Sequence, residues 1–391
     1  MINIAVVMDI TSKSGGQFHM AVSICNYLKK IKNFNFIYIA TTISAKKALD
    51  KELSINTVLY NKSNILIRLL NKLINTFSFI KIEYPFNKLL NKKRVDLIYF
   101  LNSSRLINNF NNINYIYTVF DLEHRYLQYL PEFKKNISLQ RDRDCTLASI
   151  DSKKIIAPTN SMCKQFIKLY NTDPKKITSI KFPPPITSVK INNIKKCKDE
   201  IIKYSKNKNY FLYPAQFWSH KNHEYLINAI KNIKKKEKLN FEIVFTGADK
   251  GNMGRVRKLI FTNDLYNNFK IFDYVTDQEL CLLYKNCRAV VIPTLVAPHT
   301  FPLYEAFFFK KPVIYNKHVL SNELKSKVTG LDVTDINDFN KKIKLLNNSK
   351  IIKKMIKNNH QYFLNEFKPK KIIDKLQKIF LESSKDISKN N

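Results

Sequence analysis

The chain has 391 residues, and 45% of them are hydrophobic, which is enough to build the cores of two domains. Its 67 lysines and arginines outnumber 31 aspartates and glutamates, so the formal net charge is +36. No uninterrupted apolar run reaches the length of about 18 residues that a membrane-spanning helix needs, and a strand-like run begins at residue 2, where a secretory signal would lie. The six scattered cysteines form no Cys-x-x-Cys pair. We therefore expect a cytoplasmic protein without a disulfide framework or a zinc site.

The positive charge admits more than one interpretation. A basic chain can bind nucleic acid or an anionic membrane, where each basic residue near the lipid contributes about 1 kcal/mol. The richness in Lys, Asn, Ile, Phe and Tyr, with only 6 glycines, also suggests a codon bias. Because the charge is spread over the whole chain, we attribute part of it to bias. The remainder favours peripheral contact with an anionic membrane over nucleic acid as a partner.

The N-terminal part predicts a parallel sheet. Residues 2–8 read as a buried strand and residues 17–29 as a helix, with Gly15 and Gly16 in the loop between them. Such a loop lets the backbone approach a ligand closely, although an ordinary turn would look the same. Further strands are expected at 35–41, 56–60, 95–101, 115–120 and 154–158. Their alternation with helical stretches predicts a doubly wound parallel sheet.

Residues 62–94 interleave Ile, Leu and Phe with eight basic residues. The pattern fits an amphipathic helix that lies on anionic lipid. A helix that faces the core and exposes a basic face would show the same pattern, so both interpretations stay open.

Two polar residues, Asp121 and His124, follow the strand expected at 115–120. Sites in α/β proteins form just past the carboxyl ends of strands, although a loop histidine and a helix-capping aspartate would also explain them. Asp142 and Asp144 resemble a metal-binding Asp-x-Asp, but positions i and i+2 of a helix do not share a face. We therefore expect no metal there.

A strand and a capped helix at 155–170 are followed by residues 177–180, which lead into three prolines at 183–185. Prolines stiffen an extended linker, so we place one domain at 1–185 and a second at 186–365. A Lys-rich helix is expected at 193–206. Residues 366–391 are expected to pack back on the first domain.

The second domain begins with a strand at 210–214, a loop and a helix that runs to about residue 230. Lys221 stands at the start of this helix, where it can neutralise a diphosphate leaving group. Gln216 and Asn222 share the loop. His220 and His223 have no third ligand nearby, so we expect surface and capping roles for them.

Three further strands are expected at 241–247, 271–275 and 289–294, with a helix at 278–284. Prolines then break the chain, Thr300 can cap a helix at 303–309, and a strand follows at 313–315. A helix start at a strand end is an anion site that suits phosphate. Glu305 lies in the first turn of this helix, where the helix dipole alone would also favour a carboxylate. Elements at 329–333, 337–347, 350–364 and 370–383 complete the chain.

Three segments, 118–133, 211–223 and 293–306, together resemble retaining GT-B glycosyltransferases of the group-1, family-4 type. The resemblance implies two Rossmann-like doubly wound domains that face each other across a cleft. It also implies sugar transfer, with retention and without metal, from a nucleotide sugar to a glycan or lipid-linked acceptor. Bacterial cell-surface polysaccharide or lipopolysaccharide synthesis is the implied setting.

The resemblance also implies roles for individual residues. Lys221 and the helix starts near Gly16 and Thr300 would stabilise the departing diphosphate, and Glu305 would hold the ribose. Asp121 and His124 would line the acceptor side. The remaining implied donor-site residues are Gly15, Gln216, Asn222, Gly247, Tyr274, Val275 and Phe301, of which Tyr274 and Val275 would meet the nucleobase. No cofactor is implied besides the nucleotide-sugar co-substrate.

The chain departs from the pattern of that family at three positions. Phe120, Gln216 and Ala297 stand where many relatives have His, Arg and Glu. A catalytically silent relative is therefore one alternative, and another GT-B enzyme such as a sugar-nucleotide epimerase is a second. A basic nucleic-acid-binding protein is the alternative from a different class, although no RNA or DNA motif is present.

Overall fold

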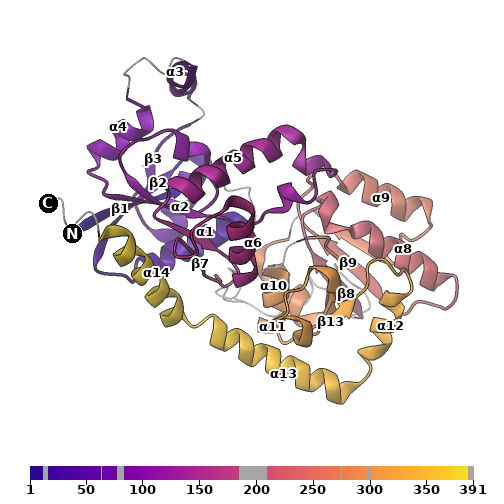
Figure 1. Ribbon diagram of the computed structural model, residues 1–391. Helices are drawn as coiled ribbons and strands as arrows, with labels where there is room; N and C mark the ends of the chain where they lie inside the picture. Colours follow the sequence, from indigo (N-terminus) through magenta and orange to yellow (C-terminus); the bar gives the residue numbers. More distant parts are fainter. Residues whose placement is uncertain are drawn as a thin grey trace. The chain divides into compact units, whose positions relative to one another are not determined.

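The computed structural model describes residues 1–11, 16–62, 64–76, 83–184, 209–273, 275–296 and 301–385. The chain divides into two compact units (Figure 1). The first unit comprises Met1–Gln128, Lys135–Pro183 and Phe367–Asn391, and the second comprises Tyr129–Lys134 and Pro184–Glu366. The sequence analysis placed Tyr129–Lys134 in the first domain, whereas the structure groups this segment with the second unit. The helix predicted at 193–206 lies outside the described residues.

The first unit is built on a seven-stranded parallel sheet with the order β3-β2-β1-β4-β5-β6-β7. The central strands are buried on both faces, as their continuous apolar runs predict. The order reverses between β1 and β4, which is the doubly wound pattern. The strands are β1 (Ile2–Met8), β2 (Phe34–Ala40), β3 (Val58–Leu59), β4 (Leu97–Phe100), β5 (Asn114–Thr118), β6 (Lys154–Ala157) and β7 (Ile177–Ser179).

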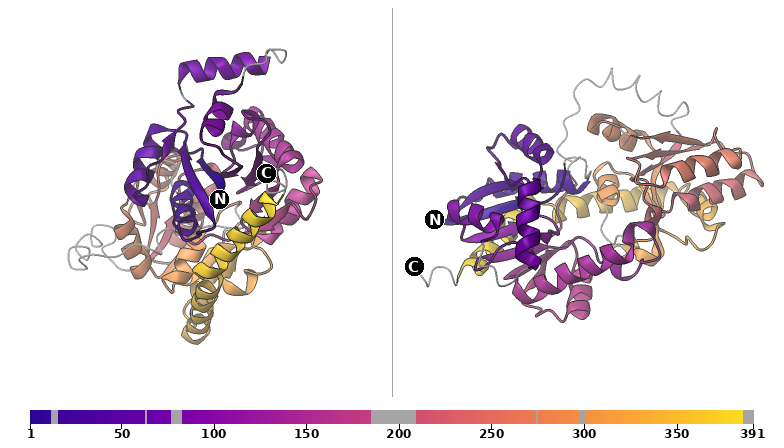
Figure 2. Two further views of the ribbon diagram at one scale, coloured as in Figure 1. Left: turned by 90° about the vertical axis from the view of Figure 1, so that its left-hand side faces the viewer. Right: turned by 90° about the horizontal axis from the view of Figure 1, so that it is seen from above.

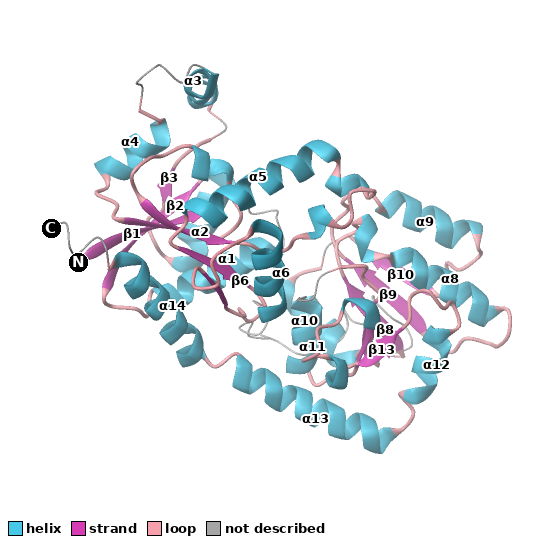
Figure 3. Cartoon of the chain, viewed as in Figure 1, coloured by secondary structure: helices cyan, strands magenta, loops and turns pink. Residues whose placement is uncertain are grey.

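The helices of the first unit lie around this sheet (Figure 3). Thr42 and Thr159 cap two of them, each accepting a hydrogen bond from the backbone N–H three residues on. The helices are α1 (Gly16–Leu28), α2 (Ile43–Leu53), α3 (Ile65–Thr76), α4 (Pro85–Lys92), α5 (Lys135–Asp151), α6 (Asn160–Tyr170) and α14 (Pro369–Ser384).

The described part of residues 62–94 contains two helices, α3 and α4. Pro85 is the first residue of α4, where its missing N–H costs no hydrogen bond. α4 packs inward through the fully buried Phe86 and Leu90, whereas α3 exposes most of its leucines. The left view of Figure 2 shows α3 held away from the sheet of its unit.

α14 completes the core of the first unit from the far end of the chain. Phe380 is fully buried, and its ring centroid lies 5.6 Å from those of Phe34, Phe36 and Tyr99. Glu382 forms an ion pair with Lys154, with 2.7 Å between the carboxylate and Nζ. The last helix is therefore an integral layer of this unit.

The second unit contains a six-stranded parallel sheet with the order β10-β9-β8-β11-β12-β13. The strands are β8 (Tyr210–Pro214), β9 (Glu242–Thr246), β10 (Phe269–Phe272), β11 (Ala289–Ile292), β12 (Val313–Asn316) and β13 (Thr329–Leu331). The helices are α8 (His223–Lys234), α9 (Met253–Thr262), α10 (Asp277–Asn286), α11 (Phe301–Phe308), α12 (Asp338–Leu345) and α13 (Ser349–Glu366).

One strand of this sheet lies two to three residues before its predicted position. The prediction was 271–275, whereas β10 covers Phe269–Phe272. Its partner β9 ends at Thr246, which pairs with Phe272, and the Gly247 N–H then donates to the Phe272 carbonyl at 3.1 Å. The length of the neighbouring strand, rather than the run of apolar residues, therefore ends β10.

Candidate functional site

The strand order of the second unit reverses between β8 and β11. In open α/β sheets, ligands bind outside the carboxyl ends of the strands at such a switch point. Most of the predicted donor-site residues follow these strands. Gln216, Lys221 and Asn222 follow β8, Gly247 follows β9, Val275 follows β10, and Phe301 and Glu305 lie on α11 after β11.

The loops after β8 and β9 approach each other closely. The Phe217 N–H donates to the Ala248 carbonyl at 3.0 Å, and the Asn252 N–H donates to the Phe217 carbonyl at 3.2 Å. A Cβ on Gly247 would lie 2.4 Å from the Ala215 carbonyl oxygen. Only a glycine fits at this crossing, so Gly247 serves the close approach of two backbones.

Lys221 ends a 3₁₀ turn, Ser219–Lys221, directly before α8. The Tyr213 hydroxyl donates to its backbone carbonyl at 2.8 Å. Asn222 adopts a left-handed conformation with φ of 55°, and its Nδ2 donates to the Pro293 carbonyl at 3.2 Å. These bonds hold the Lys221 backbone to the end of β8 and to the segment that follows β11.

The loop after β11 is joined to the same turn and to the last residue of β12. Leu295 N–H donates to the His220 carbonyl at 2.8 Å, and the Thr294 hydroxyl donates to the Val296 carbonyl at 2.8 Å. The buried Asn316 donates from Nδ2 to the Thr294 carbonyl at 2.8 Å. The loops after β8, β9 and β11 and the end of β12 therefore form one frame of neutral hydrogen bonds at the carboxyl edge of the sheet, which we call the loop frame.

Gln216 occupies the position where many relatives of the resembled family carry Arg. Its Oε1 accepts a hydrogen bond from the Trp218 indole N–H at 3.1 Å. Lys250 places its Nζ 5.8 Å from the centre of the Trp218 ring. The loop after β8 therefore has a cation beside it, which is Lys250 of the loop after β9 and not a residue at position 216.

The expectation of surface and capping roles for both histidines is wrong for His223. Its ring is fully buried and stacks on Phe217 at 4.5 Å, with Tyr213 and Phe245 each 4.9 Å away. Burial, together with the nearby Lys221 charge, lowers the pKa of His223 to about 3. His223 is therefore a neutral member of an aromatic cluster beneath the loop.

His220 is anchored by a residue that the sequence did not single out. The Oε1 atom of Glu132 accepts from the His220 backbone N–H at 2.9 Å and lies 2.7 Å from its Nδ1. Burial opposes the ionised form of Glu132, but the hydrogen bonds from His220 outweigh it and lower the pKa of this carboxyl. The short segment Tyr129–Lys134 is tied to the loop frame of the second unit in this way.

Glu305 is nearly buried, with 7% of its surface exposed, and the Tyr284 hydroxyl on α10 donates to its Oε2. Burial raises the pKa of Glu305 to about 7, although the bond from Tyr284 opposes the rise. The carboxyl of Glu305 therefore titrates near neutral pH. Tyr284 itself carried no signal in the sequence, because it lies within an ordinary amphipathic helix.

In the first unit, Asp121 lies just after β5, as predicted, and 29% of its side chain is exposed. It forms an ion pair with Arg141 of α5. Burial opposes ionisation of Asp121, but the charge of Arg141 outweighs it and lowers the pKa. Burial and the neighbouring Asp121 charge raise the pKa of Glu123, a buried carboxyl that the sequence analysis overlooked.

His124 is fully buried, which differs from the predicted place on the acceptor side. Its Nε2 lies 3.2 Å from Asp142 Oδ1 and 3.1 Å from the Tyr170 hydroxyl. Arg125 donates to the other oxygen of Asp142 at 2.9 Å, and Asp144 accepts from Gln140 instead. His124 thus acts as an internal support, and the two aspartates point to separate partners.

The remaining positions that the sequence singled out are less informative. Gly15, Tyr274, Ala297 and Thr300 lie outside the described residues. Gly16 is the exposed first residue of α1. Among the described residues, no group of three or more His, Cys, Asp or Glu side chains could hold a metal ion, and no helix within them is long and apolar enough to cross a membrane.

Comparison with known proteins finds a family match over most of the second unit and α14. Residues 195–385 match the family described as "Glycosyl transferases group 1". Over this segment, which is just under half of the chain, the sequence is similar to the group 1 glycosyltransferases. No curated protein matches the sequence.

Solved structures show the same fold over nearly the whole chain. A glycosyltransferase from Rickettsia africae is 19% identical, with a TM-score of 0.68 over 98% of this chain and 99% of that one. Anabaena Alr3699/HepE in complex with UDP-glucose is 15% identical, with a TM-score of 0.73 over 97% and 99%. WaaG, a glycosyltransferase involved in lipopolysaccharide biosynthesis, is 13% identical, with a TM-score of 0.65 over 95% and 98%. The predicted fold class, with two Rossmann-like doubly wound domains of the GT-B type, is confirmed.

Proposed function

We propose that this chain transfers a sugar from a nucleotide-sugar donor to a glycan or lipid-linked acceptor, with retention and without metal. The loop frame carries the proposal, because it fixes Lys221 and Asn222 at the switch point of the sheet whose sequence matches the group 1 family. A related fold binds UDP-glucose, which supports a nucleotide sugar as donor.

The donor diphosphate would lie against the loop after β8. The Lys221 ammonium and the backbone at the start of α11 near Phe301 would stabilise the charge that develops on the leaving group. Such stabilisation by preorganised groups typically contributes two to three orders of magnitude in rate. It does not call for a metal ion.

The ribose would be held by Glu305. Tyr284 occupies one oxygen of the carboxyl, and the ionised form could accept hydrogen bonds from ribose hydroxyls through the other. Because the pKa of Glu305 is raised to about 7, donor binding through the carboxylate should strengthen as the pH rises from 6 to 8. Val275, three residues after the end of β10, would lie toward the base.

On the acceptor side, Asp121 would contact the acceptor, since it is partly exposed and held by Arg141. His124 would act behind it as a positioning residue, because it is buried against Asp142 and Tyr170. The lipopolysaccharide enzymes WaaG and WaaB share the fold, which supports a cell-surface glycan as the product. We place the reaction at the cytoplasmic face of a membrane, with peripheral contact.

A thermal-shift screen tests the donor site. UDP, GDP, ADP, CMP and dTDP, each with its common sugars, would be added to the wild type and to Lys221→Ala and Glu305→Ala. A ligand at 100 times its Kd adds about 2.7 kcal/mol of stability. We expect one nucleotide to stabilise the wild type and Lys231→Ala, an exposed α8 control, but neither site variant.

The screen can also refute the proposal. If no nucleotide stabilises the wild type while oligonucleotides do so in a salt-dependent manner, the nucleic-acid-binding alternative replaces it. A transfer assay then tests the finer claims. Activity that survives EDTA supports metal independence, and the anomeric coupling of the product in NMR spectra reports retention or inversion. Donor turnover without any acceptor would favour an epimerase.

A further inference from the structure

The first unit contains a cavity of about 910 Å³. It lies beside the carboxyl end of β1, where Asp9 stands, and its walls come from α3, the 3₁₀ turn Arg105–Asn108 and α5. All of these segments belong to the first unit. Cavities of this volume fit a small organic molecule rather than a single ion.

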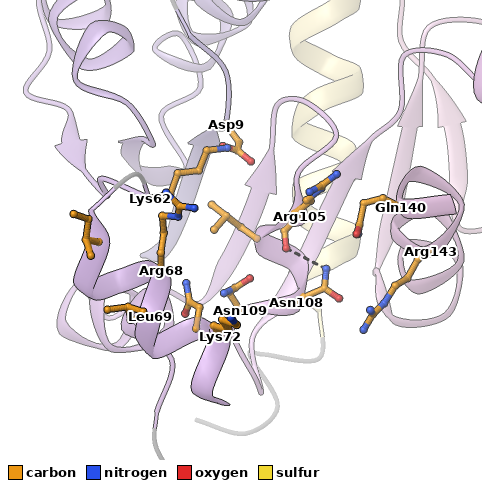
Figure 4. A pocket seen from close by; sticks show the side chains of 13 residues that line it. Asp9, Lys62, Arg68, Leu69, Lys72, Arg105, Asn108, Asn109, Gln140 and Arg143 are labelled. Atoms are coloured by element: carbon orange, nitrogen blue, oxygen red, sulfur yellow. Dashed lines mark hydrogen bonds and ion pairs between the residues drawn. The ribbon is translucent and has the colours of Figure 1, made fainter. Parts of the chain in front are cut away.

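Positive charge dominates the lining. Five basic side chains, Lys62, Arg68, Lys72, Arg105 and Arg143, face one acid, Asp9. Figure 4 shows Lys62 and Arg68 on one side of the cavity and Arg105 and Arg143 on the other. Cations crowded in this way repel one another, so the arrangement favours an anionic occupant.

The one acid is already engaged by its neighbours. Asp9 accepts hydrogen bonds from Thr41 at 2.8 Å and Ser104 at 2.7 Å, and it forms an ion pair with Lys62. Among the described carboxylates, none lies within 4.0 Å of Arg68, Arg105 or Arg143, although the last two act on Asp144 at longer range. A net surplus of positive charge therefore faces the cavity.

The chemistry of the lining favours phosphate with hydroxyl groups beside it. The planar arginine fork matches the oxygens of a phosphate and binds it through two hydrogen bonds. Asn108, Asn109 and Gln140 add carboxamides to the same wall, and carboxamides both donate to and accept from hydroxyl groups. The head group of a phosphorylated sugar or polyol has this combination.

One rim of the cavity is apolar. Ile65 and Leu69 of α3 line it and are 71% and 53% exposed. Leu66, Leu70 and Leu73 continue the same face of the helix, at 70%, 38% and 46% exposure. The opposite face carries Ile74, which is buried. Contiguous exposed leucines beside a cationic cavity indicate a surface that hydrocarbon covers.

We propose that the cavity binds the phosphate-bearing head group of an amphiphile whose hydrocarbon chain lies along the exposed face of α3. The cationic side chains hold the phosphate, and Ile65 and Leu69 lead from the head group to the chain. The proposed function would make this amphiphile the lipid-linked acceptor, and that assignment rests on the proposed function. The binding itself does not depend on that function.

Titration calorimetry without nucleotide tests the proposal in 150 mM NaCl, where charges more than about 8 Å apart are screened. Farnesyl diphosphate is the probe, and inorganic pyrophosphate and farnesol represent its two halves. We expect farnesyl diphosphate to bind at least tenfold more tightly than either half. The pyrophosphate arm separates a free phosphate ligand from a lipid head group.

Two pairs of variants locate the site. Arg105→Gln with Arg143→Gln should weaken both phosphate probes about a hundredfold, at roughly tenfold for each charged contact. Leu69→Gln with Leu73→Gln should weaken farnesyl diphosphate about tenfold and leave pyrophosphate unchanged. The control removes two exposed charges elsewhere in the unit, Lys88→Gln on α4 and Lys164→Gln on α6, and should change affinity less than twofold.

Several outcomes would overturn the proposal. Equal affinity for pyrophosphate and farnesyl diphosphate would leave a bare anion site, and an equal loss in the control would leave general charge attraction. An unchanged affinity in the leucine variant would remove α3 from the site. Nucleotide stabilisation of Arg105→Gln with Arg143→Gln should match the wild type, because the donor site lies in the other unit. The experiment therefore distinguishes a wrong proposal for the cavity from a wrong proposal for the donor site.

Discussion

The sheets of the two units have the same strand order over six strands, to which the first unit adds β7, and they differ in what holds the carboxyl ends of their strands. In the first unit, charged pairs dominate this edge, with Asp9 bound to Lys62 and Asp121 bound to Arg141. In the second unit, the loop frame joins three loops and the end of β12 through backbone and amide groups. Two carboxyls lie beside it, Glu132 bonded to His220 and the almost buried Glu305. The same backbone topology therefore supports two kinds of edge.

The difference bears on what each edge can bind. A frame of neutral hydrogen bonds fixes its geometry independently of pH and salt, which suits a site that must stabilise a leaving group. An edge made of charged pairs with a surplus of cations is less rigidly specified but attracts anions of varied shape. The following predictions, ordered by the size of the expected effect, test this contrast.

The largest effect is expected on activity in the second unit. Lys221→Ala should lower kcat/KM by a factor of 10² to 10³, because it removes a preorganised charge at the leaving group. Its fold should persist, since Tyr213 binds the backbone carbonyl of Lys221 and not its side chain. Steady-state transfer kinetics measure the effect against Lys231→Ala. Equal rates for both variants would remove Lys221 from the site.

The loop frame should be destabilised when a side chain is placed at Gly247, where the backbones after β8 and β9 approach each other. Gly247→Ala would place a Cβ 2.4 Å from the Ala215 carbonyl oxygen, and we expect a loss of about 3 kcal/mol from overpacking and backbone strain. Gly254→Ala on α9 is the matched control, because no atom lies within 4 Å of its added Cβ. Urea denaturation should show the control as stable as the wild type or slightly more so. Equal stability of Gly247→Ala and Gly254→Ala would refute the crossing.

Glu305 should make the second unit less stable as the pH rises. Its pKa is about 7 in the folded chain against an ordinary value of 4.5. Between these values the folded chain keeps a proton that the unfolded chain releases. The free energy of unfolding should therefore fall by roughly 3 kcal/mol relative to Glu305→Gln, with no further change above pH 8. A constant difference between the two proteins from pH 4.5 to 8 would contradict this.

Asp121 should show the opposite dependence in the first unit. The ion pair with Arg141 lowers its pKa, so its contribution is present at neutral pH and is lost as the pH falls. Asp121→Asn should cost about 2 kcal/mol at pH 7, as expected for a charged hydrogen bond, and less in acid. The control Asp151→Asn alters an exposed residue of α5 and should stay within about 0.5 kcal/mol of the wild type. A cost that does not shrink on acidification would show that charge is not the cause.

The smallest effect concerns the partner of Glu305. Tyr284→Phe removes one hydrogen bond and should cost about 1 kcal/mol, while the pKa of Glu305 rises further because the bond from Tyr284 lowers it. Tyr210→Phe removes a comparable bond to the Leu283 carbonyl, 2.8 Å long, and should leave the titration of Glu305 unchanged. Carboxyl titration by NMR distinguishes the two. Identical titration in both variants would refute the coupling between Tyr284 and Glu305.

The sequence predicted the repeating architecture well, because each buried strand reads as a short apolar run bounded by turn residues. The strand predicted at 210–214 is β8 to the residue, and the fold class follows from the alternation of strands and helices. The site was predicted as positions after strands. The bonds that hold those positions, such as Asn316 to Thr294, join residues too far apart in the chain to be read from it.

The failures share a physical cause, which is burial of polar residues by distant partners. His223 was assigned to the surface from its polarity, yet three aromatic rings surround it. His124 was assigned to the acceptor side, yet Asp142 and Tyr170 enclose it. The five cations of the first-unit cavity are dispersed over residues 62–143. A composition bias that spreads lysine and arginine everywhere conceals such a cluster in the sequence.

The place of α14 in the first unit sets the order in which the chain can fold during its synthesis. Phe380 fills a space among Phe34, Phe36 and Tyr99, but a ribosome adds about 5–20 residues per second. Residues 184–366 lie between the first unit's central segments and its last helix, so these aromatic rings wait roughly 10–40 seconds for their partner. The first unit therefore completes its fold after the second, although most of it is synthesised first. Until α14 is made, Phe34, Phe36 and Tyr99 form a hydrophobic surface that a chaperone could bind.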